Sequence, residues 1–142
     1  MPVQNDQNVK KEWLDVKGAV SILVVDDEQM MCTLLTKILR REGYQVETAA
    51  GGAEALEKLQ RAPYSIVISD MKMPGMDGFE LLKQVKQMYP DVGVIIMTAY
   101  GDTYTVKDAL LLGADEYITK PFKSYEISLV VERAYWRLSS KH

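Results

Sequence analysis

Short apolar runs alternate with longer amphipathic segments along most of the chain. The runs rich in β-branched residues, typical of strands buried in a parallel sheet, lie at 21–25, 66–68, 92–97 and 116–119. Apolar residues at helical spacing predict helices at 28–41, 53–61, 78–89, 103–112 and 125–139. Because strand and helix alternate through five units, we expect one α/β domain with helices on both faces of a parallel sheet.

The apolar faces of these helices supply the expected core. The residues that recur at core spacing on the first three helices are Met31, Leu34, Leu35, Ile38, Ala55, Leu56, Leu59, Phe79, Leu82 and Val85. Three further methionines, Met30, Met88 and Met97, stand where core-filling side chains are expected. Gly43 is expected to end the first helix, and Pro63 follows the second.

The last helix has apolar residues on two sides. Its core stripe consists of Ile127, Val130, Val131, Ala134 and Leu138. A second line, made of Tyr125, Leu129 and Trp136, lies on another side of the helix. A helix with two apolar sides has a second partner. Three partners remain open: a second copy of the chain, an effector protein, or the chain's own Trp13 and Leu14.

Residues 1–20 are polar apart from Trp13, Leu14 and Val16, which predicts an N-terminal extension, either a disordered leader or a short extra helix. The domain itself is then expected at 21–140. We find no signal-peptide pattern and no apolar run as long as a membrane span, and the single cysteine, Cys32, cannot form an internal disulfide. We therefore expect a soluble cytoplasmic chain in which Cys32 is buried or half-buried.

Composition argues against several functions. The net charge is −3 across 142 residues and the basic pairs at 10–11 and 40–41 are isolated, so we expect no nucleic-acid binding. The only histidine, His142, is the last residue, which argues against a His-based metal site, a Ser-His-Asp triad and a phosphohistidine carrier. The glycines at 51–52 are not followed by a phosphate-loop lysine, so ATP binding is not indicated.

Polar groups at the strand ends could form one site. Asp26 and Asp27 follow the first strand, and Asp70, Thr98 and Lys120 follow the runs at 66–68, 92–97 and 116–119. Taken alone, Asp70 could be a turn residue, and Thr98 and Lys120 could be strand-end residues that face water. In a parallel sheet, however, the carboxyl ends of the strands meet at one edge, where ligands bind. Three converging carboxylates repel one another unless a cation joins them, and an oxygen-only ligand set suits Mg²⁺.

The motifs around these residues occur in the order and at the spacing of a known family. They read Val-Val-Asp-Asp-Glu, Ser-Asp-Met-Lys-Met-Pro-Gly-Met-Asp-Gly, Met-Thr-Ala and Ile-Thr-Lys-Pro-Phe. Over residues 21–138 the chain resembles the response-regulator receiver domain of two-component signalling, most of all the receivers of NtrC-type transcriptional activators. The resemblance implies a flavodoxin-like (βα)5 three-layer sandwich with parallel strands in the order 2-1-3-4-5.

The resemblance also implies a role for each residue of the metal site. Asp70 would accept a phosphoryl group as an acyl phosphate. Mg²⁺ would be bound by Asp27, Asp70 and the backbone carbonyl of Lys72, with Asp26 acting mainly through water. In this family, the residues at two positions guide or block the water that removes the phosphoryl group. In this chain these positions are Lys72 and Tyr100. Neither side chain can orient water, so we expect slow dephosphorylation, over minutes or longer.

Further roles follow for the last two strands. Lys120 and the Thr98 hydroxyl would contact the phosphoryl oxygens. The bond between Lys120 and Pro121 would be cis, as X-Pro bonds alone allow at low cost. Thr98 would be drawn toward the phosphoryl group, and the Tyr117 ring would turn inward into the space released. The alternative for Tyr117 is a plain half-buried strand aromatic.

The resemblance implies a signalling domain that takes a phosphoryl group from a sensor histidine kinase onto Asp70 with Mg²⁺, without turnover of an external substrate. Its output surface would combine the helix at 103–112, the strand at 116–119 and the helix at 125–139, and would bind a second protomer or an effector. The alternative is an interaction module of the same fold that is not phosphorylated. An aspartyl phosphatase is not indicated, because those enzymes need a second acid two residues past the nucleophile, where this chain has Lys72.

Overall fold

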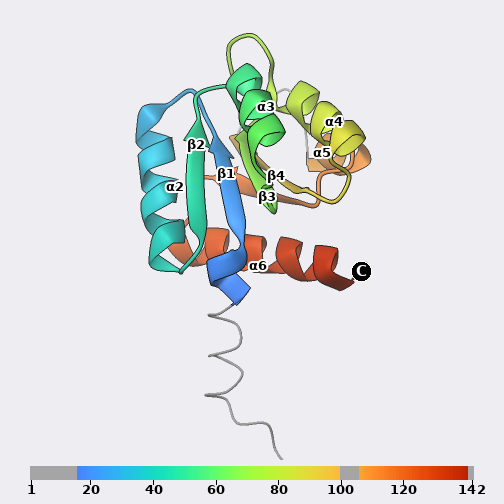
Figure 1. Cartoon of the computed structure of the whole chain (residues 1–142). Coiled ribbons are helices and arrows are strands. Elements are labelled where there is room, and N and C mark those ends of the chain that lie inside the picture. Colours follow the sequence, from blue (N-terminus) through green and yellow to red (C-terminus); the bar gives the residue numbers. More distant parts are fainter. Residues whose placement is uncertain (1–15, 100–105, 141–142) are drawn as a thin grey trace, which may run out of the picture.

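The computed structural model describes residues 16–99 and 106–140, which form a parallel five-stranded sheet in the order β2-β1-β3-β4-β5 (Figure 1). The strands are β1 (Ser21–Val25), β2 (Gln45–Ala49), β3 (Ile66–Asp70), β4 (Gly93–Ala99) and β5 (Glu116–Lys120). Each neighbouring pair is parallel. The predicted α/β class and the strand order 2-1-3-4-5 are confirmed.

The helices cover both faces of this sheet. They are α2 (Gln29–Arg41), α3 (Gly52–Arg61), α4 (Gly78–Met88), α5 (Val106–Leu111) and α6 (Ser124–Ser140). Buried residues of α2 and α6 share one core cluster, whereas those of α3, α4 and α5 share the other. Figure 1 shows the resulting three layers. Gly43 takes a φ of 105° just after α2, which confirms that a glycine ends this helix.

Alternation along the central strands fills both clusters. In β1, Ile22 and Val24 face the α2 and α6 side, whereas Leu23 and Val25 face the other side. All four side chains are fully buried. This explains why the central strands are continuous apolar runs, whereas the edge strand β2 mixes exposed, half-buried and buried positions.

Some details of the predicted core and strand ends are wrong. Met30 is 83% exposed, and Leu34 and Met88 are also exposed, because each lies on the outward side of its helix. Met97 and Cys32 are buried as expected. Strands β3, β4 and β5 also continue past their apolar runs, so that Asp70, Thr98 and Lys120 belong to the strands. Parallel pairing continues through these polar positions, as in the pair of Asp70 with Met97.

The chain before β1 packs onto the domain. Residues 16–19 form a helical turn, and Val16 contacts the core cluster of α2 and α6. Lys17 is buried, and its Nζ lies 3.1 Å from Glu42 Oε2 and 3.9 Å from Glu132 Oε1. Trp13 and Leu14 lie outside the described residues. The expected boundary between residues 20 and 21 stays a prediction. Within the described ranges, no helix has the length and apolar character needed to cross a membrane.

Candidate functional site

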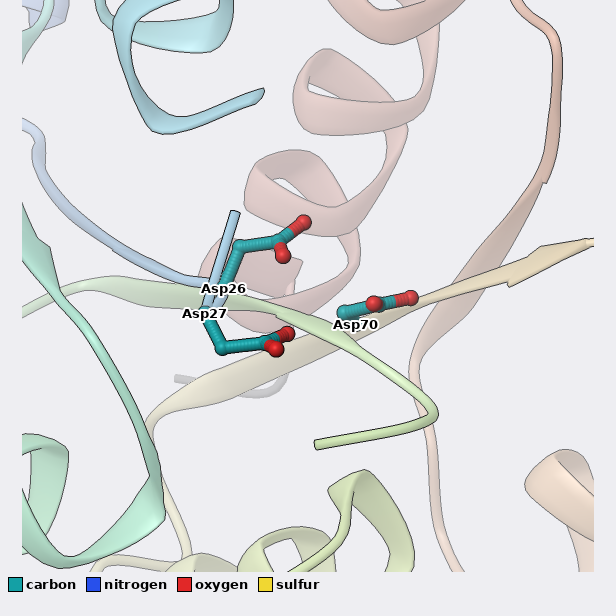
Figure 2. Close-up of side chains that lie close together, drawn as sticks. All are labelled: Asp26, Asp27 and Asp70. Atoms are coloured by element: carbon teal, nitrogen blue, oxygen red, sulfur yellow. The ribbon is translucent and has the colours of Figure 1, made fainter. Parts of the chain in front are cut away.

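Three carboxylates lie together at the carboxyl edge of the sheet. Asp26 and Asp27 directly follow β1, and Asp70 is the last residue of the neighbouring β3. One oxygen from each carboxylate lies within 4.8 Å of the others. Figure 2 shows the three side chains close together at these strand ends. The predicted convergence of Asp26, Asp27 and Asp70 therefore holds in the structure.

Asp26 is the most deeply buried of the three. Its side chain is fully buried, and Oδ1 accepts a hydrogen bond from the Glu28 backbone N–H at 2.9 Å. The other oxygen, Oδ2, is also buried and accepts no hydrogen bond from any described residue. Burial raises the pKa of the Asp26 carboxyl. The Glu28 hydrogen bond opposes this, and the charge of Asp70 adds to it. The charged form of Asp26 is therefore less favourable than that of a solvent-exposed aspartate.

Lys120 supplies a cation to this cluster. Its Nζ donates a hydrogen bond to Asp70 Oδ1 at 3.0 Å and lies 3.7 Å from Asp26 Oδ2. Burial alone would lower the pKa of Lys120, but the hydrogen bond to Asp70 and the charges of Asp70 and Asp26 raise it overall. Lys120 is therefore protonated at neutral pH. The bond from Lys120 to Pro121 is cis, as predicted.

The backbone also orients Asp70. The Met71 N–H donates to Asp70 Oδ1 at 3.0 Å, so this oxygen accepts two hydrogen bonds. The Asp70 carbonyl accepts a hydrogen bond from Ser69 Oγ at 2.9 Å. Sequence reasoning missed the Met71 contact, because a backbone donor leaves no signal in the choice of side chain.

The remaining predicted residues lie in different environments. Thr98 is buried in β4, one position beyond the residue that pairs with Asp70. Tyr117 on β5 is 37% exposed and lines a groove of about 280 Å³ with residues of α6. Lys72 is exposed in the loop after β3. Tyr100 lies outside the described residues.

The donor set fits a divalent cation with oxygen ligands. The three carboxylates bring more negative charge than the Lys120 ammonium group offsets, and within the described ranges no residue donates a hydrogen bond to the buried Asp26 Oδ2. Carboxylate oxygens are the ligands that Mg²⁺ and Ca²⁺ prefer. This cluster could therefore hold a metal ion between the ends of β1 and β3.

Replacing Asp26 with asparagine is expected to stabilise the metal-free protein at neutral pH by about 0.5–2 kcal/mol. The replacement removes a buried charge, and the asparagine side chain can still accept the hydrogen bond from the Glu28 N–H. The folded pKa of Asp26 lies above its ordinary value of 3.8, so the cost is absent below pH 3.8 and grows as pH rises through the folded pKa. Urea unfolding at pH 7 and pH 3.5 checks this, with Glu57→Gln, an exposed carboxylate of α3 outside the cluster, as control. A stability gain of equal size at both pH values would contradict it.

Comparison with known proteins identifies the family. A model of the response regulator receiver domain matches residues 22–132. The transcriptional regulatory protein ZraR of Klebsiella oxytoca is 43% identical over 122 residues, which cover 84% of this chain and 28% of ZraR. NtrC of Escherichia coli, a DNA-binding transcriptional regulator, is 42% identical over 113 residues, which cover 80% of this chain and 24% of NtrC. The chain therefore spans about a quarter of the length of these two relatives.

Other relatives are matched over nearly their whole length. Sporulation initiation phosphotransferase F of Bacillus subtilis is 41% identical over 112 residues, which cover 79% of this chain and 90% of that protein. A receiver domain protein from Clostridium thermocellum has a similar structure, with a TM-score of 0.82 and 32% identity over 87% of this chain and 99% of that one. NtrX from Brucella abortus also gives a TM-score of 0.82, with 34% identity over 87% of this chain and 28% of NtrX. This chain belongs to the response regulator receiver domain family, and its relatives include the receivers of NtrC-like regulators.

Proposed function

We propose that Asp70 accepts a phosphoryl group from a sensor histidine kinase, with Mg²⁺ bound in the carboxylate cluster, and that the domain signals by a change of shape. The observation that carries this proposal is the hydrogen bond from Lys120 to Asp70 within a cluster of three carboxylates at the sheet edge. A structural ion pair does not need two further acids beside it. One of these acids, Asp26, is buried, and its Oδ2 accepts no hydrogen bond from the part of the chain that the structure describes.

The hydrogen bonds of Asp70 suggest how the transfer proceeds. Among the described residues, both donors to this carboxylate bond to Oδ1, so Oδ2 is the oxygen that attacks phosphorus. The Oδ2–P bond forms as the bond from phosphorus to the donor nitrogen breaks, and the electron pair leaves with the donor. Lys120 keeps its proton and places positive charge beside the phosphoryl oxygens. Catalysis by this chain is confined to its own phosphorylation.

Asp27, Asp70 and the backbone carbonyl of Lys72 would hold Mg²⁺, with Asp26 acting through water. When bound, Mg²⁺ supplies positive charge that offsets the charge of the phosphoryl oxygens and the repulsion among the carboxylates. The same three carboxylates destabilise one another in the metal-free protein, which favours a cation at this place.

We assign the output to the surface of α5, β5 and α6. Thr98 is buried on β4, next to the residue that pairs with Asp70, whereas Tyr117 is partly exposed on the next strand. After phosphorylation the Thr98 hydroxyl moves toward the phosphoryl group, and the Tyr117 ring occupies the space released. The surface also exposes Leu111, Leu129 and Trp136, which suit an apolar partner, either a second protomer or an effector.

Intact mass spectrometry after incubation with acetyl phosphate tests the proposal. We expect a gain of one phosphoryl group in the presence of MgCl₂ and no gain when EDTA replaces it. Asp70→Asn should gain no phosphoryl group in either condition. Asp77→Asn, the matched control, should gain one as the native protein does, because this carboxylate lies in the loop after Asp70 but caps α4, and asparagine caps equally well. If the native protein gains no mass with Mg²⁺, the function is instead that of an unphosphorylated binding module.

A further inference from the structure

Met76, in the loop of residues 71–77 between β3 and α4, packs against the start of α3. Gly52, the first residue of α3, is buried, and the side chain of Met76 occupies the space beside it. A Cβ at Gly52 would lie 2.7 Å from Met76 Sδ and 2.9 Å from both Met76 Cβ and Cγ. Glycine is therefore the residue that lets Met76 pack directly on the α3 backbone.

Met76 is also fixed from the side of α4. The Gln84 side-chain amide approaches Met76 Sδ at 3.9 Å, within the range of a weak hydrogen bond to sulfur. Asp77 caps α4 by accepting a hydrogen bond from the Glu80 N–H, and Gly75 just before Met76 has a φ of 77°. The loop thus reverses at Gly75 and delivers Met76 onto Gly52.

The contact of Met76 with Gly52 links the two sides of the carboxylate cluster. On one side, the Asp26 N–H donates to the carbonyl of Ala49, the last residue of β2, three positions before Gly52. On the other side, Met76 belongs to the loop that starts directly after Asp70. The segment that carries Asp26 and Asp27 and the loop that carries Lys72 are therefore joined through the start of α3.

We propose that Met76 is a positioning residue for the metal site: by packing on Gly52 it holds the loop, and with it the Lys72 carbonyl, at a fixed position relative to Asp27 and Asp70. This inference rests on the proposed binding of Mg²⁺ in the cluster. Residues that orient metal ligands without touching the metal typically change metal affinity by about 10–100-fold when they are replaced. Met76 acts in this way because it fixes the position of the loop backbone that carries the Lys72 carbonyl.

The test is the Mg²⁺ dissociation constant, measured from the rise in unfolding temperature during a MgCl₂ titration. Met76→Ala is expected to weaken Mg²⁺ binding about tenfold or more, and Met76→Leu, which refills the space on Gly52, is expected to restore most of the affinity. Met88→Ala is the matched control, because Met88 is 51% exposed in the last turn of α4 and should leave the constant unchanged.

A double-mutant cycle with Gly52→Ala separates positioning from simple packing. Gly52→Ala displaces the same side chain, so its loss of Mg²⁺ affinity should not add to that of Met76→Ala. Additive losses would overturn the proposal, as would a Met76→Ala protein that is less stable but binds Mg²⁺ with native affinity. If the native protein does not bind Mg²⁺, the proposed metal site is overturned as well. If the native protein binds Mg²⁺ and Met76→Ala binds it with the same dissociation constant, the positioning role alone is overturned.

Discussion

Lys120→Met is expected to slow phosphoryl uptake by Asp70 about 10²–10³-fold, the usual effect of removing one preorganised donor from a transition state. Methionine keeps the length and apolar stem of lysine and removes the ammonium group that lies 3.0 Å from Asp70 Oδ1. Mg²⁺ binding should persist or tighten, since a competing cation is lost. The rate is measured by intact mass during incubation with acetyl phosphate, and Mg²⁺ affinity by the thermal shift.

Lys86→Met is the matched control for this change. Lys86 pairs with Asp115 at 2.6 Å and donates to the Val92 carbonyl, and both side chains are largely buried, but the pair lies outside the carboxylate cluster. This variant should lose stability and keep the native rate of uptake. Uptake at the native rate by Lys120→Met would contradict the role of Lys120, and loss of uptake in both variants would assign the effect to stability.

The contribution of Lys120 to stability should also depend on pH. Its folded pKa lies above the ordinary value of 10.5, so its stabilising effect is fully present below pH 10.5 and is lost as pH rises through the folded pKa. The native protein and Lys120→Met should therefore differ in free energy of unfolding by a constant amount between pH 7 and pH 9, and by less above pH 10.5.

Gly78→Ala is expected to destabilise the protein by about 1–3 kcal/mol, the usual cost of forcing an extra methyl group into a packed site. Helix propensity predicts the opposite sign, because alanine favours a helix over glycine by about 1 kcal/mol. The packing cost outweighs the gain in helix propensity, since the new Cβ would overlap the Asp70 carbonyl oxygen and lie 2.9 Å from Met71 Cα. Both are backbone atoms, which cannot move without displacing the end of β3. Urea unfolding gives the free energy.

Gly18→Ala is the control for the glycine prediction. Gly18 lies in the helical turn before β1, and a Cβ there meets nothing within 4 Å. This variant should be as stable as the native protein or slightly more stable. The explanation for Gly78 is wrong if both variants show the same change in free energy of unfolding.

Much of the fold could be predicted because the central strands are buried on both faces. Such strands appear in the sequence as continuous apolar runs, as in β1 and β3. The edge strand β2 gave no such run, because Gln45 and Glu47 are exposed on it, and its bounds were not predicted. Leu34 was wrongly placed in the core, since its spacing fits the apolar stripe of α2 while its side chain lies at the exposed margin.

The sequence predicts that the side chains of the candidate site converge, but it does not predict the loop packing and backbone hydrogen bonds that hold them in place. Asp26, Asp27, Asp70 and Lys120 stand at the ends of strands, and parallel pairing is enough to bring such positions together. The contacts that hold the site, such as the packing of Met76 on Gly52, depend on how loops meet in space. Neither glycine spacing nor apolar periodicity carries that information.

The most direct test of the central claim is to locate the phosphoryl group. Borohydride reduces an acyl phosphate on an aspartate side chain to the alcohol of homoserine, which peptide mass spectrometry can place in the sequence. After incubation with acetyl phosphate and Mg²⁺, we predict homoserine at position 70 and unmodified aspartate at positions 26 and 27. Homoserine at either of those two positions, or at none of the three, would contradict the assignment of Asp70 as the phosphoryl acceptor.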